Sequence, residues 1–162
     1  MPPLPRTAEW FDLSRIHVGG PRPDDTRRVT RALPATGTTS VLIVEDNDKN
    51  MKLVRDLLEF AGVPTLEAST GEQGIALARE HRPRAMLLDV QLPTLSGLEV
   101  LEVLRKDERT AGIVVIAVTA YAMSGDRERL LAAGFDGYLS KPIDVRTFVA
   151  DVERYVAAAR VG

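Results

Sequence analysis

The feature that most constrains the fold of this 162-residue sequence is a set of short aliphatic runs, each followed directly by polar residues. Residues 41–44 read VLIV, residues 85–88 read AMLL and residues 113–118 read IVVIAV. Aliphatic runs of this length without alternation are typical of strands buried on both faces, as in a parallel sheet covered by helices. A fourth, more mixed run, GYLS, spans residues 137–140.

Segments with the apolar spacing of amphipathic helices separate and follow these runs. Gly62 and Gly134 are expected to end the first and fourth helices, and Thr70 and Asp144 to cap the second and fifth. The expected helices cover about residues 51–61, 71–82, 98–106, 124–133 and 145–156. Five β/α units in about 120 residues predict an α/β fold with a doubly wound five-stranded parallel sheet.

Two of these helices have predicted buried faces that the structure can test. The third is expected to bury Leu98, Leu101 and Leu104. The fifth is expected to place one apolar face on the sheet, made of Val145, Phe148, Val149, Val152, Tyr155 and Val156.

The polar residues that follow the runs form a chemically coherent set. Glu45 and Asp46 follow the first run, Asp89 the second, Thr119 the third and Lys141 the fourth. Carboxyl ends of parallel strands meet at one edge of a sheet, where ligands of such folds bind. Asp46 and Asp89 offer hard oxygen ligands for Mg²⁺, and Glu45 adds charge directly or through water.

A lysine and a hydroxyl complete the chemistry that these carboxylates suggest. Lys141 supplies a fixed positive charge and Thr119 a rotatable hydroxyl, both suited to phosphoryl oxygens. The set therefore predicts a covalent acyl phosphate on Asp89. Each residue also has a plain structural explanation: the acids at 45–46 suit a helix N-terminus, and Asp89 suits a turn. All of these residues occur together, in order, and each lies at the end of a predicted strand. This joint occurrence favours the phosphoryl-binding interpretation over the structural one.

Composition excludes several other classes of site and partner. The chain has no Cys and only two His, so thiolate, disulfide and His-rich zinc sites are excluded. The formal net charge of −2 argues against a general nucleic-acid binder. No apolar stretch approaches the roughly 20 residues of a membrane span, and no secretory signal is visible. We therefore expect a cytoplasmic protein that binds neither nucleic acid nor membrane.

Residues 1–38 differ from the rest of the chain. They hold six of the ten Pro, with six Arg against four acidic residues, and only residues 10–18 show a short apolar pattern. This composition predicts a largely disordered arm, followed by one domain over residues 39–162. The arm is too short for an output domain, so we expect a stand-alone domain that acts by docking.

The stretches VLIVEDN, LLDVQLPTLSGLEVL, VIAVTAYAM and GYLSKPI resemble signatures of the CheY-like receiver domain of bacterial two-component response regulators. The resemblance covers about residues 40–158 and is greatest to single-domain receivers of phosphorelays and to receivers of hybrid kinases. It implies a flavodoxin-like (βα)5 fold with strand order 2-1-3-4-5. It also implies a Mg²⁺-dependent phosphoacceptor that assists only its own phosphorylation and dephosphorylation, rather than an enzyme.

Residue roles follow from the same resemblance. Asp89 would be the phosphoacceptor, and Lys141 would contact the phosphoryl group on it. Metal ligands would be Asp46, Asp89 and the backbone oxygen of Gln91, with Glu45 binding directly or through water. The switch pair would be Thr119 and Tyr138, and the Lys141–Pro142 bond would be cis.

The resemblance also implies the partners. The phosphoryl donor would be a histidine kinase or a histidine phosphotransfer protein. A downstream protein would dock on the face formed by the fourth helix, fifth strand and fifth helix. Tyr121 and Met123 lie at the edge of that face, where docking and packing roles both stay open.

Other classes of protein fit the same residues less well. A haloacid dehalogenase phosphatase needs a second Asp where Gln91 stands. A flavodoxin-like FMN carrier needs a loop that binds phosphate after the first strand, but acids occupy residues 45, 46 and 48 there. A dinucleotide site needs a glycine-rich turn after the first strand, and this sequence has none there. A phosphorylation-independent pseudo-receiver is the remaining alternative, although such a module should have lost an acid, the Thr or the Lys.

Overall fold

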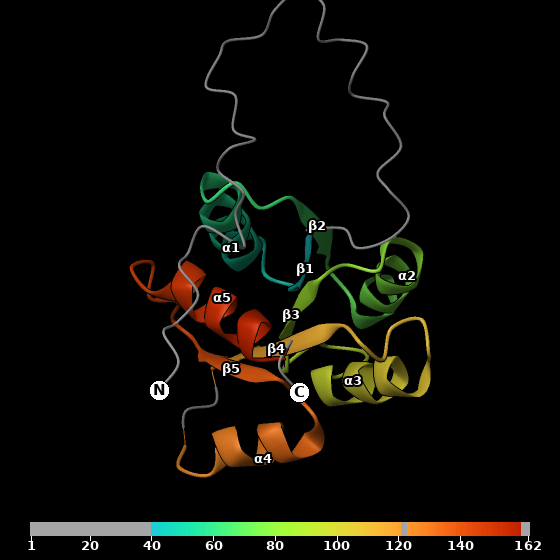
Figure 1. Ribbon diagram of the computed structural model, residues 1–162. Helices are drawn as coiled ribbons and strands as arrows, with labels where there is room; N and C mark the ends of the chain where they lie inside the picture. The colour runs from blue at the N-terminus through green and yellow to red at the C-terminus, as the bar shows by residue number, and fades with distance from the viewer. Residues whose placement is uncertain (1–39, 121–122, 160–162) are drawn as a thin grey trace, which may run out of the picture.

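The computed structural model describes residues 40–120 and 123–159 (Figure 1). A five-stranded sheet with the order β2-β1-β3-β4-β5 forms its centre, and every neighbouring pair of strands is parallel. The predicted fold class and strand order are thereby confirmed. The predicted arm, including Trp10, lies outside the described residues, as does Tyr121.

Strands and helices alternate along the described chain without interruption. The strands are β1 (Val41–Val44), β2 (Thr65–Ala68), β3 (Ala85–Asp89), β4 (Val114–Thr119) and β5 (Gly137–Ser140). The helices are α1 (Asp48–Phe60), α2 (Gly71–His81), α3 (Gly97–Lys106), α4 (Asp126–Ala133) and α5 (Phe148–Ala159). Within the described residues, no helix is long and apolar enough to cross a membrane.

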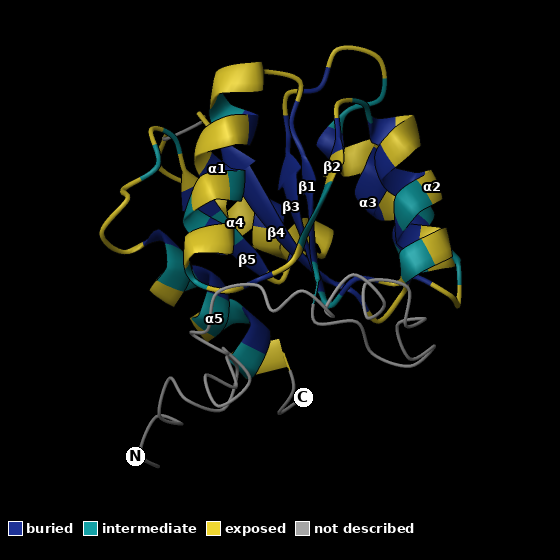
Figure 2. Ribbon diagram, turned by 90° about the horizontal axis from the view of Figure 1, so that it is seen from above, coloured by how far each residue is buried: buried dark blue, intermediate teal, exposed yellow. Residues whose placement is uncertain are grey.

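The sheet separates two apolar cores because successive strand side chains point to opposite faces. On β1, Val41 and Ile43 belong to the core that also contains residues of α1 and α5, whereas Leu42 and Val44 belong to the core that contains residues of α2, α3 and α4. The same alternation runs through β3 and β4. Figure 2 shows the buried strands between helices whose outward faces are exposed. Burial on both faces explains the continuous aliphatic runs of the sequence.

Helix starts and ends follow local chemistry. The Thr70 side chain accepts a hydrogen bond from the Gln73 backbone N–H at the start of α2, as the capping pattern predicts. The Gln73 side chain, however, accepts from the backbone of Ser69 rather than Thr70. Gly134 adopts a positive φ of 112° and ends α4.

Two predicted helix faces are partly wrong. Leu98 is 44% exposed, because the buried side of α3 consists of Gly97, Val100, Leu101 and Leu104. At 100° per residue, Leu98 lies about 110° from the centre of that face. Val145 is 54% exposed, because α5 begins only at Phe148 and residues 145–147 form a turn. In that turn Asp144 accepts from the Arg146 backbone N–H.

Candidate functional site

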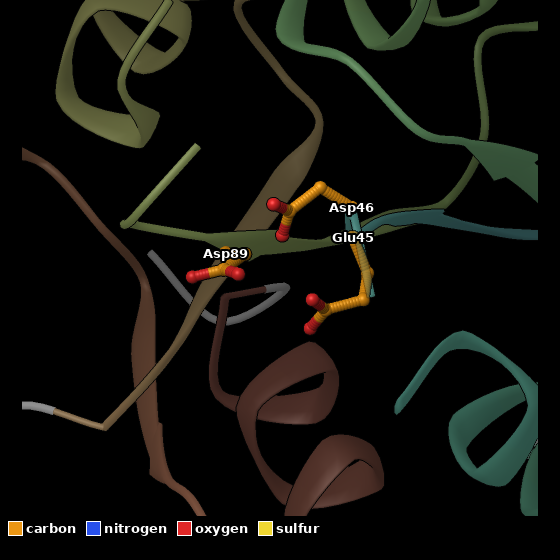
Figure 3. Close-up of side chains that lie close together, drawn as sticks. All are labelled: Glu45, Asp46 and Asp89. Carbon is orange, nitrogen blue, oxygen red and sulfur yellow. The ribbon is translucent and has the colours of Figure 1, made fainter. Parts of the chain in front are cut away.

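Three carboxylates meet at the carboxyl edge of the sheet (Figure 3). Glu45 and Asp46 follow β1, and Asp89 ends the neighbouring strand β3. One oxygen from each of the three carboxylates lies within 4.8 Å of the other two. Glu45 and Asp89 are buried, at 5% and 4% exposed, while Asp46 is exposed. The cluster therefore has two buried members and one that faces solvent.

Lys141 holds the two buried acids together. Its Nζ donates to Glu45 Oε2 at 2.7 Å and to Asp89 Oδ2 at 3.1 Å. The lysine side chain is only 18% exposed, and it reaches the cluster from the end of β5, two strands away from Asp89. A buried carboxylate pair needs such a cation because each unpaired charge in the interior costs several kcal/mol.

Backbone amides fix the remaining oxygens of the buried acids. The Gln91 N–H donates to Asp89 Oδ1 at 2.9 Å, and the Asn47 N–H donates to Glu45 Oε1 at 3.1 Å. Asn47 in turn caps α1 by accepting from the Lys49 and Asn50 amides. The turn after β3 thus holds the Asp89 carboxylate, and the turn after β1 holds the Glu45 carboxylate.

The electrostatics of the cluster follow from this burial and pairing. Burial raises the pKa of Glu45 above its usual value, although hydrogen bonds from Lys141 and the Asn47 amide oppose the rise. Burial by itself would lower the pKa of Lys141, but its hydrogen bonds to Glu45 and Asp89 outweigh this and raise that pKa. Lys141 is therefore a permanent cation at neutral pH.

Replacing Lys141 with Met should make stability more dependent on pH. The variant loses the donor that holds down the pKa of Glu45, so this pKa should rise further. A group with a raised folded pKa binds protons more tightly when folded. Stability therefore falls as the pH rises from the unfolded value of 4.5 through the folded pKa. We expect a loss of about 2 kcal/mol near neutral pH and a clearly smaller loss at pH about 4.5.

Urea unfolding of Lys141→Met at the two pH values measures this difference. Lys106→Met is the matched control, because Lys106 is 73% exposed and forms an ion pair with Glu102 one turn away on the same helix. An equal loss of stability at both pH values would contradict the assigned role of Lys141.

The predicted switch pair lies on the two strands beyond the cluster. Thr119 is fully buried at the end of β4, and its carbonyl accepts from the Lys141 N–H at 2.8 Å. Tyr138 is half-buried on β5 and pairs in register with Ala117. The Lys141–Pro142 bond is cis, as the resemblance implied. The structure thus brings Glu45, Asp46, Asp89 and Lys141 together, and sets Thr119 nearer to them along the strands than Tyr138.

Gly97, which the sequence alone did not single out, supports the end of β3. Gly97 begins α3 and donates its N–H to the Val90 carbonyl at 3.1 Å. A Cβ at Gly97 would lie 2.7 Å from both the Asp89 carbonyl oxygen and the Val90 Cα. Only a residue without a side chain allows α3 to approach the backbone of Asp89 this closely. The available signal was a glycine directly before the predicted helix over residues 98–106, close in sequence to Asp89.

Comparison with known proteins identifies the family of this chain. A family model described as the response regulator receiver domain matches residues 41–153. This chain belongs to the response regulator receiver family. The polar-differentiation response regulator DivK of Brucella ovis is 50% identical to it over 122 residues, which cover 75% of this chain and 99% of that protein.

Solved receiver structures share the fold. The receiver domain of a sensor histidine kinase from Pseudomonas aeruginosa is 32% identical, with a TM-score of 0.67, over 73% of this chain and 97% of that one. That structure has a magnesium ion coordinated in its active-site cleft. A CheY-like receiver from Methanospirillum hungatei is 29% identical, with a TM-score of 0.67, over 75% of this chain and 96% of that one.

Proposed function

We propose that this receiver accepts a phosphoryl group on Asp89 from a histidine kinase or a histidine phosphotransfer protein. In this transfer a P–N bond to the donor histidine breaks and a P–O bond to Asp89 forms, which leaves a mixed anhydride on the protein. The observation that carries the proposal is the placement of Asp89 between the acid cluster and Lys141 Nζ at the sheet edge.

The donor set fits a magnesium ion. Asp46 and Asp89 would hold it, with the backbone oxygen of Gln91, and Glu45 would contribute directly or through water. Carboxylate and carbonyl oxygens are the ligands that Mg²⁺ prefers, and exposed Asp46 leaves one side of the cluster open to solvent. When bound, the ion would neutralise charge shared by the phosphoryl group and the three carboxylates.

The protein's own groups prepare Asp89 and receive the product. The Gln91 amide and Lys141 orient the Asp89 carboxylate before transfer. As the phosphoryl group arrives, Lys141 can exchange its bond to Asp89 for a phosphoryl oxygen and keep its bond to Glu45. The Thr119 hydroxyl can bind another phosphoryl oxygen. The chain then acts as a phosphoacceptor that assists only its own phosphorylation and dephosphorylation, in the cytoplasm.

The output of phosphorylation would be a change in the α4–β5–α5 face. Among the residues of α4, Leu130 alone is buried, so this helix is held by little packing. On the same face, Tyr155 of α5 donates from its hydroxyl to the Tyr138 carbonyl at 3.0 Å. Met123, before α4, is 79% exposed. Movement of Thr119 and Tyr138 would therefore alter a weakly anchored surface for a downstream protein.

Replacing Asp46 with Ala should abolish phosphorylation by a small acyl phosphate, because the exposed metal ligand is lost. Excess EDTA should have the same effect on the wild-type protein. Gel-shift or mass measurement of the adduct, with and without Mg²⁺, tests both. Asp48→Ala, which removes an exposed acid two residues away, is the matched control and should leave labelling intact. Undiminished labelling in EDTA would refute the metal dependence.

A further inference from the structure

An apolar stripe runs along α1 beside its buried face. Leu53, Leu57 and Phe60 follow one another at intervals of four and three residues, so they lie within about 60° of one another around the helix. Phe60 is 97% exposed and Leu53 is also exposed, whereas Leu57 is half-buried. A single exposed apolar side chain is ordinary, but an almost fully exposed Phe that continues a row of two Leu forms a surface that another segment can cover.

The stripe borders an existing core. Helices α1 and α5 cover the same face of the sheet (Figure 1), and both contribute residues to the core on that face. Leu57 packs against this core, whereas Phe60, one turn further along α1, extends beyond it into solvent. A segment that lies on Phe60 would therefore extend a core that is already formed.

The N-terminal arm joins the domain at the Phe60 end of the stripe. The Val41 N–H donates to the Pro64 carbonyl at 2.9 Å, which holds the start of β1 against the loop that follows α1. The Val63 N–H donates to the Leu58 carbonyl at 2.9 Å, so this loop folds back onto the last turn of the helix. The chain that precedes β1 therefore begins close to Phe60.

The arm contains one segment that suits such a stripe. Residues 10–18 read WFDLSRIHV and carry the short apolar pattern of the arm, together with the only Trp of the chain. The 21 residues between Val18 and Ser40 would have a root-mean-square span of about 25 Å as a coil. The stripe is only about 10 Å long, because α1 rises about 1.5 Å per residue. The segment can therefore reach every part of the stripe.

Charge favours the same pairing. The arm has six Arg against four acidic residues, whereas the rest of the chain has more acidic than basic residues. Glu59 is exposed and precedes Phe60 directly, and Arg15 lies within the apolar segment of the arm. Opposite charges at the rim of an apolar contact favour one pairing of surfaces over others.

The size of the stripe favours a tethered segment over a second molecule. A stable interface between separate proteins buries at least about 1,200 Å² in total. Three side chains on one helix cannot supply such an area. A segment of the same chain acts at an effective concentration on the order of 1 mM, so a much smaller contact is sufficient.

We propose that residues 10–18 of this chain dock on the stripe formed by Leu53, Leu57 and Phe60. The aromatic side chains of the segment cover Phe60, and the docked segment shields the stripe from other proteins. This inference is independent of the phosphoacceptor function, because it uses no residue of the acid cluster.

Fluorescence of the full-length protein tests the docking, because Trp10 is the only Trp. We expect emission at a shorter wavelength than in the urea-unfolded protein, because docking removes the indole from water. Phe60→Ser should shift the emission to the unfolded position and increase acrylamide quenching at least about twofold, since it releases the segment. Met123→Ser, which removes a 79% exposed apolar side chain outside the stripe, is the matched control and should leave the emission unchanged.

Trp10→Ser in the full-length protein gives an independent measurement. Amide shifts in NMR spectra should change at residues 53–61 of α1 and its end. They should stay unchanged at residues 97–106, because α3 packs on the opposite face of the sheet. Changes that spare residues 53–61 would contradict the proposed docking surface.

Three fluorescence results would overturn the proposal. One is wild-type emission at the wavelength of the unfolded protein. Another is a blue-shifted emission that Phe60→Ser leaves in place, which would locate Trp10 on a different surface. The third is a blue shift that disappears on dilution, which would identify a second copy of the chain as the occupant of the stripe.

Discussion

Replacing Asp89 with Asn is expected to abolish the alkali-labile phosphoryl adduct that the wild-type receiver should form with Mg²⁺ and a small acyl phosphate. The amide oxygen is a far weaker nucleophile than a carboxylate and contributes no negative charge to a metal site. In the structure the two carboxylate oxygens accept from different donors, Lys141 and the Gln91 N–H. An amide can accept through only one oxygen, so one of these donors loses its partner.

Mass spectrometry of the intact protein before and after alkali treatment measures this loss. Asp48→Asn is the matched control, since it removes one exposed charge close to the cluster and should leave the adduct intact. Thermal unfolding of Asp89→Asn shows whether the fold persists. An undiminished adduct on the folded Asn variant would place the phosphoacceptor elsewhere.

Replacing Gly97 with Ala is expected to damage both stability and phosphoryl transfer. The new Cβ would lie 2.7 Å from the Asp89 carbonyl oxygen and 2.7 Å from the Val90 Cα, so backbone must move to admit it. Overpacking of this kind destabilises by about 1–3 kcal/mol, and backbone contacts favour the upper part of that range. The displaced backbone carries the Asp89 side chain with it, so phosphorylation should slow at least about tenfold.

Gly112→Ala is the matched control for this prediction. A Cβ at Gly112 meets nothing within 4 Å, and Gly112 does not have a positive φ. This variant should be neutral or slightly more stable, because alanine restricts the unfolded chain. Urea unfolding and the rate of labelling by acyl phosphate give the two readouts. Equal stability of the two alanine variants would mean that α3 does not depend on the close approach at Gly97.

Four of the five strands and the acidic edge were predictable because their causes lie in adjacent residues, whereas β2 (Thr65–Ala68) has no such aliphatic run. Aliphatic runs without alternation are stable only when both faces are covered, which implies helices on both sides and parallel connections. A parallel sheet brings the carboxyl ends of its strands to one edge whatever the details of packing. Glu45, Asp89 and Lys141 could therefore be assigned to one site before any contact was known.

Helix faces were less predictable, because a periodic pattern allows more than one orientation. Leu98, Leu101 and Leu104 repeat every three residues and drift around the helix by about 60° at each step. Either Leu98 or Val100 could have completed the buried side of α3. The neighbouring α2 and the sheet selected Val100, which is fully buried, and left Leu98 exposed. The start of α5 was likewise placed three residues too early, because Val145 fits the apolar spacing of the helix although residues 145–147 form a turn.

The sequence by itself determined the fold class, the strand order through its resemblance to receivers, and the residue types at the sheet edge. Tertiary structure decided which of those residues touch. Lys141 bonds Glu45 across 96 residues of chain, a pairing that depends on how far β5 extends beside β4. The approach of Gly97 to Asp89 likewise arises from elements that meet only after folding. Such contacts depend on the relative placement of rigid elements, which no local pattern of side chains encodes.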